Sequence, residues 1–104
     1  MNNGRQSEIM LLDFYGSLLT ERQNQILEYY LNQDLSMQEI ADDLDISKSA
    51  VNDTIHRSLE TLKKYEENLN LIRMYEQRQT IYQKYATNEN ADVQHLIAEL
   101  QEIE

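Results

Sequence analysis

The sequence contains no cysteine, no proline and only two glycines in 104 residues. Without cysteine there is no disulfide framework, no thiol nucleophile and no thiolate metal site. Proline and glycine are the residues that most often interrupt helices, so their scarcity favours long helices joined by short connections. No glycine-rich phosphate loop or metal-ligand pattern is present either. We therefore expect a protein that binds no cofactor and is not an enzyme.

Long apolar stretches are also missing. The longest strictly apolar run covers residues 9–12, whereas a membrane-spanning helix needs about 20 apolar residues. The first residues lack the basic and then apolar pattern of a signal peptide. These absences predict no membrane insertion and a cytoplasmic location.

Positive charge is scarce as well. Nine basic residues stand against nineteen acidic ones, giving a net charge of -10, and the acidic excess is spread evenly along the chain. A protein that holds DNA through phosphate contacts is usually basic, because each neutralised phosphate releases counterions. Bulk nucleic acid would be repelled unless the few cations gather on one face.

The apolar residues of the first half recur at helical spacing. After a frayed segment over residues 1–7, the pattern predicts a helix from Glu8 to about Leu18. A second helix is capped by Thr20 and ends at residues 32–34. The inward stripes of these two helices are Ile9, Leu12, Phe14, Tyr15 and Leu18, then Ile26, Leu27, Tyr30 and Leu31.

The next stretch holds the most specific pattern. Residues 36–39 form a capping box, in which Ser36 and Glu39 satisfy each other's backbone N–H groups. The short helix that follows carries the small Ala41 where a second helix would cross closely. Asp45 falls where such turns favour a left-handed residue, and Ser47 caps the next helix. This combination favours a helix-turn-helix over its alternative, a capped helical hairpin inside an ordinary all-α bundle.

The helix that begins after Ser47 has no stop signal for many residues. Its apolar stripe runs from Val51 to Ile72, and a second stripe, offset by one residue, runs from Leu71 to Tyr85. One continuous helix that turns a new face to a second partner is the alternative, and we favour a break near residues 68–70. A loop over 87–90 and a last helix capped by Asn90 follow.

The expected fold is therefore all-α. It is a helix-turn-helix bundle with a long recognition helix and additional C-terminal helices. We expect a helix-turn-helix domain over residues 8–67 and a helical extension over 68–104. The apolar stripe from Leu62 to Tyr85 exceeds what a three- or four-helix core needs, so we expect a homodimer. Folding back of the last helix onto the same surface is the competing use.

The exposed face of the recognition helix supplies the candidate nucleic-acid-binding residues, with Asp53 among them. They are Ser47, Lys48, Ser49, Asn52, His56, Arg57, Lys63 and Lys64. Cations can contact phosphates or guanine, and asparagine can pair with adenine. The alternative is a solvated helix face of mixed charge. His56 and His95 are expected at the surface or in packing rather than on a metal. The seven tyrosines are expected in helix seams rather than stacked on bases.

Several blocks of this sequence resemble the YlxM family of small bacterial proteins. The blocks are Leu12–Gln23, the pair Tyr29-Tyr30, Ser36–Val51, and Ile55-His56-Arg57 with Leu62, Tyr65-Glu66-Glu67 and Leu69. The resemblance covers about residues 9–85. It implies a fold similar to the helix-turn-helix of sigma factor region 4 and a regulator linked to the signal recognition particle pathway.

Two functions follow as expectations. The first is a regulator that binds DNA. The alternative is an accessory factor that binds the protein or RNA of the signal recognition particle without sequence-specific DNA binding. The acidic charge favours a basic protein partner for the second function.

Overall fold

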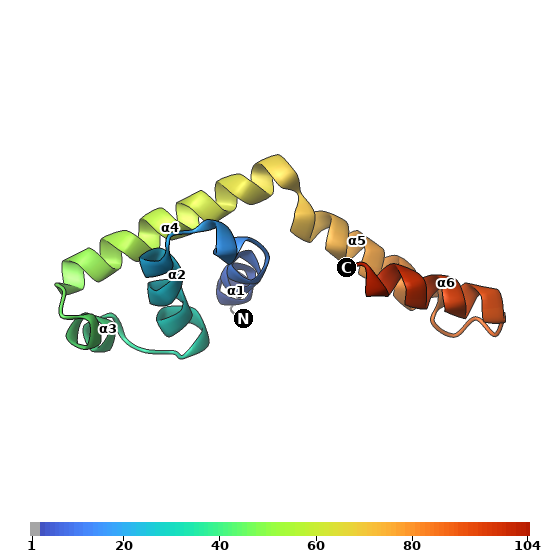
Figure 1. Ribbon diagram of the computed structural model, residues 1–104, viewed down its shortest axis with the longest axis horizontal. Coiled ribbons are helices and arrows are strands. Elements are labelled where there is room, and N and C mark those ends of the chain that lie inside the picture. Colours follow the sequence, from blue (N-terminus) through green and yellow to red (C-terminus); the bar gives the residue numbers. More distant parts are fainter. Residues whose placement is uncertain (1–2) are drawn as a thin grey trace. The chain divides into compact units, whose positions relative to one another are not determined.

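The structure is a computed structural model that describes residues 3–104, and every regular element in this range is helical (Figure 1). The elements are α1 (Asn3–Tyr15), the 3-10 turn η1 (Gly16–Leu18), α2 (Glu21–Leu27), the π-helical turn η2 (Glu28–Asn32), α3 (Met37–Leu44), α4 (Lys48–Leu69), α5 (Leu71–Tyr85) and α6 (Ala91–Glu102). The predicted all-α class is confirmed. Contacts divide the chain between Ile72 and Arg73 into two compact units. The domain boundary expected between residues 67 and 68 stays a prediction.

The first unit is built around α4, the longest helix. Helices α1, α2 and α3 each pack against it, and Figure 1 shows them along one side of α4. Their apolar stripes meet in one core, which consists of Leu11, Leu12, Tyr15, Ile26, Leu27, Leu31, Ile40, Ala41, Val51, Ile55, Leu59 and Leu62. Burying each large aliphatic side chain contributes about 1.5–3 kcal/mol. The core therefore fixes α4 against the three shorter helices.

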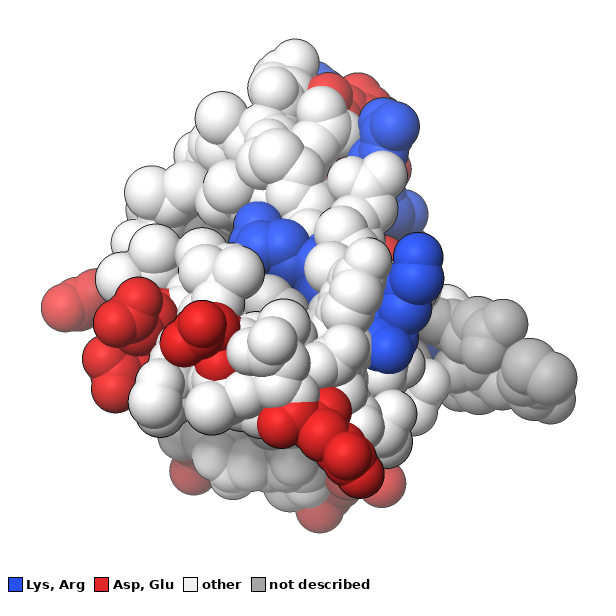
Figure 2. Space-filling view, turned by 90° about the vertical axis from the view of Figure 1, so that its right-hand side faces the viewer, with Lys and Arg blue, Asp and Glu red and all other residues white. Residues whose placement is uncertain are grey.

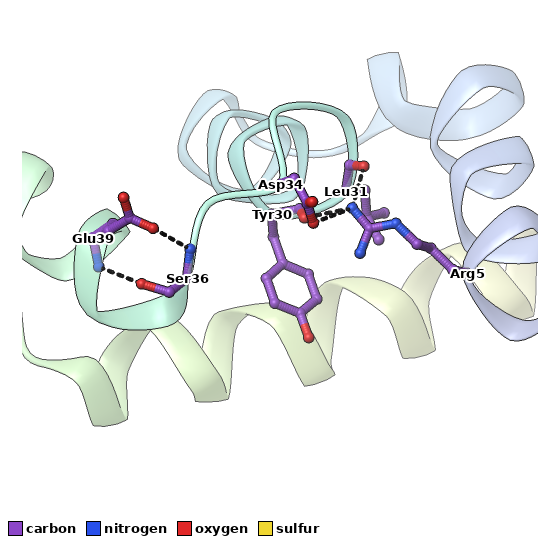
Figure 3. A network of polar contacts seen from close by, with 6 residues as sticks. All are labelled: Arg5, Tyr30, Leu31, Asp34, Ser36 and Glu39. Atoms are coloured by element: carbon purple, nitrogen blue, oxygen red, sulfur yellow. Dashed lines mark hydrogen bonds and ion pairs between the residues drawn. The ribbon is translucent and has the colours of Figure 1, made fainter. Parts of the chain in front are cut away.

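The expectation of a frayed start is wrong for residues 3–7, which form the first turns of α1; residues 1–2 lie outside the described part of the chain. The reason is a contact distant in sequence (Figure 3). The guanidinium of Arg5 donates to the carbonyl of Leu31 at 2.8 Å and lies 2.9 Å from the Asp34 carboxylate. Helix ends leave carbonyls without partners, and Arg5 satisfies one of them.

The end of α1 also differs from expectation. The helix stops at Tyr15, and Leu18 is 55% exposed rather than part of the core. Gly16 lies so close to α2 that an added Cβ would sit 2.9 Å from the Asn24 side-chain nitrogen. That nitrogen donates to the Gly16 carbonyl at 2.9 Å. This close approach ends the α-helix and turns the chain into α2.

The predicted cap of α2 is confirmed. Thr20 accepts from the Gln23 backbone N–H, and the Gln23 side chain accepts from the Thr20 N–H, which completes a capping box. Ile26, Leu27 and Leu31 are buried as predicted. Helix α2 continues through the π-helical turn η2, which ends at Asn32 and so agrees with the predicted end at residues 32–34.

The predicted break between α4 and α5 is confirmed at Asn70, which is left-handed with φ 55°. A partly buried network holds this junction. The Tyr15 hydroxyl donates to Glu66 at 2.5 Å and accepts from the Leu71 N–H at 3.0 Å. Glu66 also accepts from the Ile72 N–H at 3.0 Å. Burial, and then the hydrogen bond to Glu66, raises the pKa of Tyr15.

The second unit, residues 73–104, is a helical hairpin of α5 and α6. Asn90 caps α6 as predicted by accepting from the Asp92 N–H at 2.8 Å. In the loop, the Gln94 amide donates to the Asn88 carbonyl at 2.6 Å. At the open end of the hairpin, the Glu104 carboxylate lies 3.3 Å from Arg78 Nε and accepts from the Tyr82 hydroxyl. Tyr82 is the one buried residue between 73 and 104.

Candidate nucleic-acid interface

The corner between α3 and α4 is built by local hydrogen bonds. The Ser36 hydroxyl accepts from the Glu39 N–H at 3.1 Å, and the Glu39 carboxylate accepts from the Ser36 N–H at 2.9 Å (Figure 3). Asp45 adopts the left-handed conformation with φ 56° and donates its N–H to the Ala41 carbonyl. The Ser47 hydroxyl then accepts from the Ala50 N–H at 3.0 Å. The chain therefore turns at Asp45 as predicted.

Tertiary packing holds the same corner. Ile40, Val51 and Ile55 are buried between α3 and α4, and the small Ala41 is 3% exposed. Leu44 and Ile46 are half-buried against the same cluster. Because α4 is fixed from both the cap and the core, the direction of its outward side chains is fixed as well. The helix-turn-helix predicted from the sequence is present.

All seven candidate binding residues on α4, and its cap Ser47, lie at the surface. Lys48, Ser49, Asn52, His56, Arg57, Lys63 and Lys64 are each exposed. One of the cations is already paired, because Arg57 Nε lies 3.1 Å from the Asp53 carboxylate one turn earlier. Exposed pairs of this kind contribute little stability, but the carboxylate would repel a phosphate approaching Arg57.

The cations of α4 fall into two rows. Successive residues of an α-helix are rotated by about 100°, so Lys48, Asn52, His56 and Lys63 lie within about 80° of one another. We call these four residues row A. Arg57 and Lys64 lie about 20° apart on another face, which we call row B, and Arg57 is about 180° from Lys48. The candidate residues therefore do not form one continuous basic strip.

The neighbours of the two rows differ. Lys63 lines a groove with Glu8 of α1, Tyr30 of η2 and Met37 of α3. Arg57 and Lys64 line a second, shallow groove with Gln23 of α2 and Thr61. His56 and Glu60 border both grooves. Sequence reasoning missed Gln23 as a member of this surface, although its capping-box spacing from Thr20 placed it at the start of α2.

The segment from α3 into the first half of α4 is acidic. Residues 37–57 hold five acidic and two basic residues, and Glu39, Asp42, Asp43 and Asp45 are all exposed. Figure 2 looks onto the right-hand side of Figure 1, where red side chains gather in the lower part and blue ones stand in separate groups with white ones between them. The cations at the start of α4 therefore lie in a segment of net negative charge, which weakens their attraction for phosphates.

The remaining expectations from the sequence concern metal binding, the histidines, membrane helices and the tyrosines. The described residues 3–104 contain no group of three or more His, Asp and Glu side chains positioned to hold a metal ion. His56 and His95 are both exposed. Among the same residues, no helix combines the length and the apolar character that crossing a bilayer requires. Of the seven tyrosines, only Tyr85 is exposed, in keeping with helix seams.

The capped corner at Asp45 and the long helix that follows define an all-α helix-turn-helix protein. Residues 2–103 match the family described as "UPF0122: Putative helix-turn-helix protein, YlxM / p13 like". The chain belongs to this family, and the resemblance drawn from the sequence blocks is confirmed.

Relatives of the same family name align over most of the chain. A UPF0122 protein of Halalkalibacterium halodurans is 41% identical over 96 residues, which are 90% of this chain and 88% of the relative. One of Staphylococcus epidermidis is 38% identical over 96 residues, which are 90% and 87% of the two chains. One of Desulforamulus reducens is 47% identical over 68 residues, covering 65% of this chain and 58% of the relative. That last alignment spans less than two thirds of the relative's length.

Proposed function

We propose that this chain is a cytoplasmic regulatory protein that binds nucleic acid through row A of α4, acts as a homodimer and catalyses no reaction. One observation carries the proposal. Row A begins directly after the Ser47 cap, is exposed along its length, and is fixed in direction by the buried corner at Ala41. A rigid, exposed start of the second helix is the part of a helix-turn-helix that enters a major groove.

The residues of row A have distinct expected roles. Lys48 suits a phosphate oxygen or the acceptor edge of guanine, and Asn52 can form two hydrogen bonds with adenine. His56 is one turn further along and suits a phosphate. Lys63 is about 22 Å from Lys48 along the helix axis, beyond the width of a single groove, so it contributes a separate phosphate contact.

The charge balance sets the strength of binding. Two or three phosphate contacts for each chain predict a weak complex whose affinity falls with salt at a slope of about -2 to -3. Row B is not included among these phosphate contacts, because the Asp53 carboxylate already pairs with Arg57. A homodimer would present row A twice, which raises the affinity for two neighbouring half-sites. This is the physical reason for including the dimer in the proposal.

A comparison of the two rows tests the proposal. Fluorescence anisotropy with duplex fragments at low salt should show that Lys48→Glu weakens binding by about tenfold or more. Lys64→Glu makes the same charge change on row B and serves as the matched control, with an expected loss of about threefold or less. Asn52→Ala should reduce discrimination between sequences more than it reduces overall affinity.

The result that would overturn the proposal is an equal loss in Lys48→Glu and Lys64→Glu. Equal losses would mean that affinity for the anionic probe depends only on the net charge of the protein and not on which row carries the cation. Complete absence of binding by the unchanged protein at low salt would have the same consequence, because screening is weakest there.

A second candidate function is favoured by the acidic corner. Glu39, Asp42, Asp43 and Asp45 are exposed on α3 and at its turn into α4, a charge arrangement that suits a basic protein surface. On this alternative, the chain is an accessory factor that binds the signal recognition particle, through its protein or its RNA. The resemblance to the YlxM family names this partner, and the acidic corner supplies the physical argument.

Purified particle components would separate the two candidates. If the protein of the particle is the partner, Asp42→Lys with Asp43→Lys should weaken capture and abolish any change in GTP turnover, whereas Lys48→Glu should not. If its RNA is the partner, the order should reverse. No association at micromolar concentration with either component would reject the second function.

A further inference from the structure

The hairpin of α5 and α6 carries an open groove in which every lining side chain is aliphatic or a tyrosine. Ile81 and Tyr85 of α5 form one wall, and Val93, Leu96 and Leu100 of α6 form the other, with Tyr82 and Ile97 also lining it. Ile81 is 54% exposed and Leu96 is 56% exposed. An amphipathic helix normally buries such a stripe against another element.

The hairpin does not supply that element itself. Tyr82 is the one buried hydrophobic side chain of residues 73–104, although Asn90 caps α6 and only a short loop joins the two helices. Two helices form a stable layer only when their shared apolar face is covered. An uncovered apolar groove of this kind marks an interaction surface.

The charges on either side of the groove have opposite signs. Helix α5 has three basic residues and one acidic residue, and α6 has three acidic residues and neither Lys nor Arg. Lys84 is three residues after Ile81, and Asp92 and Glu99 are four before and three after Leu96. These spacings place each charge beside the exposed apolar row of its own helix. The apolar face is thus positive along one edge and negative along the other.

We infer that the occupant of this groove is the hairpin of a second copy of the same chain. A two-fold axis parallel to the helices places α5 of one copy on α6 of the other and brings each positive edge onto a negative edge. A two-fold axis that lies in the apolar face and runs perpendicular to the helices would instead place α5 on α5. That arrangement would bring like charges together. Charge therefore selects the first arrangement, an antiparallel four-helix bundle.

One ion pair follows directly from this geometry. Lys84 lies at the end of α5 and Asp92 at the start of α6, so both are at the loop end of the hairpin. Rotation about a two-fold axis parallel to the helices leaves the position of each residue along that axis unchanged. Lys84 of each copy is therefore expected opposite Asp92 of the other, twice in the dimer. Both side chains are exposed in the single chain.

The inference rests on the homodimer included in the proposed function and specifies its interface. Sedimentation velocity of the full chain at micromolar concentrations, without nucleic acid, tests it. We expect a dimer whose Kd rises about 100-fold in Leu96→Glu. Ala98→Glu introduces the same charge about 200° away on α6, and this matched control should remain a dimer. Circular dichroism checks that both variants stay helical.

Charge exchange provides a second readout that does not depend on the apolar side chains. Lys84→Glu and Asp92→Lys should each weaken the dimer about tenfold, because each change opposes like charges at both edges. The double variant, which carries both changes in one chain, should recover most of this loss.

A mixture of the two single variants shows whether the pair forms between copies. In the mixed dimer, the carboxylate introduced at position 84 of one copy meets the ammonium group introduced at position 92 of the other. The second edge keeps the original pair of Lys84 and Asp92. The mixture should therefore dimerise about as well as the unchanged protein. A pair formed within one chain would recover in the double variant but not in the mixture.

Three results would overturn the inference. The first is a monomeric unchanged protein at high micromolar concentration, which would also remove the homodimer from the proposed function. The second is a dimer equally stable in Leu96→Glu and Ala98→Glu, which would keep the homodimer but reject this surface. The third is a mixture of the single variants that dimerises no better than either alone, which would reject the α5-on-α6 pairing. The anisotropy measurements with Lys48→Glu report separately on nucleic-acid binding.

Discussion

The two units of the chain use similar helices but differ in how far they bury them. Residues 3–72 enclose twelve buried hydrophobic side chains, whereas residues 73–104 bury only Tyr82. Helix caps are present in both, at Ser36 and Ser47 in the first unit and at Asn90 in the second. The difference shows that local signals define the helices and that packing against other elements stabilises them.

The largest expected difference between the units concerns core truncation. Leu62→Ala removes a fully buried side chain of α4 and should lower the free energy of unfolding by about 2–5 kcal/mol. Leu18→Ala, a matched change at an exposed position, should cost less than about 1 kcal/mol. Urea titration measures both.

Protein concentration sharpens the same comparison. The loss in Leu62→Ala should be the same at low and high protein concentration, because that site is covered within one chain. The loss in Leu96→Ala should grow with concentration if a second copy covers the site. An effect of Leu96→Ala that is independent of concentration would contradict this expectation.

The next effect concerns the junction that joins α1 to the start of α5. Tyr15→Phe removes the hydroxyl that bonds Glu66 and Leu71, which leaves partly buried polar groups with fewer partners. We expect a loss of about 1–3 kcal/mol in the free energy of unfolding. Tyr85→Phe removes an exposed hydroxyl and should change little. A Tyr15→Phe protein as stable as the unchanged one would show that water replaces the network at no cost.

The same tyrosine gives a pH dependence. Its pKa is raised above the ordinary value of 10.0, chiefly by burial and then by Glu66. The folded state therefore holds this proton more tightly than the unfolded state, so the stabilisation is fully present below pH 10 and is lost as the pH rises through the folded pKa. Between neutral and strongly alkaline pH, the free energy of unfolding should therefore fall less steeply in Tyr15→Phe than in the unchanged protein.

The caps of the helix-turn-helix should have a smaller effect than the core. Ser47→Ala removes the acceptor for the Ala50 N–H and should cost about 1 kcal/mol, as replacements of N-cap residues usually do. Ser47→Asp keeps an acceptor at the same position and is the matched control. If both variants lose the same stability, the cap is not the cause.

The smallest predicted effect lies at the corner itself. Asp45 is left-handed with φ 56°, a conformation that costs a side chain about 1 kcal/mol relative to glycine. Asp45→Gly should therefore raise the free energy of unfolding by about 0.5 kcal/mol, since glycine also gains entropy in the unfolded chain. Asp45→Val should lower it, because a β-branched side chain tolerates this conformation poorly.

Much of the fold was predictable because its signals are local. The capping box at Ser36, the left-handed Asp45 and the break at Asn70 each depend on residues a few positions apart. The exposed Leu18 was predicted wrongly for the opposite reason. Its helical spacing is correct, but Gly16 packs against Asn24 and ends α1 before the stripe reaches it.

The candidate site was predictable as a set of residues but not as a surface. The rotation of about 100° per residue was sufficient to separate row A from row B, and that signal was present in the sequence. The grooves that flank the rows depend on distant residues, such as Gln23 beside Lys64 and Glu8 beside Lys63. Those neighbours follow from how the helices pack.

The sequence by itself determined where α2, α3, α4 and α6 start and where the chain turns at Asp45 and Asn70, because caps and left-handed residues act through hydrogen bonds within one turn of the chain. The tertiary structure decided how far α1 extends and which residues distant in sequence come into contact. Arg5 extends α1 by bonding the end of η2, and Tyr15 joins Glu66 across 51 positions. Such contacts bring together groups whose separation in sequence carries no periodic signal, so only the packed core could place them.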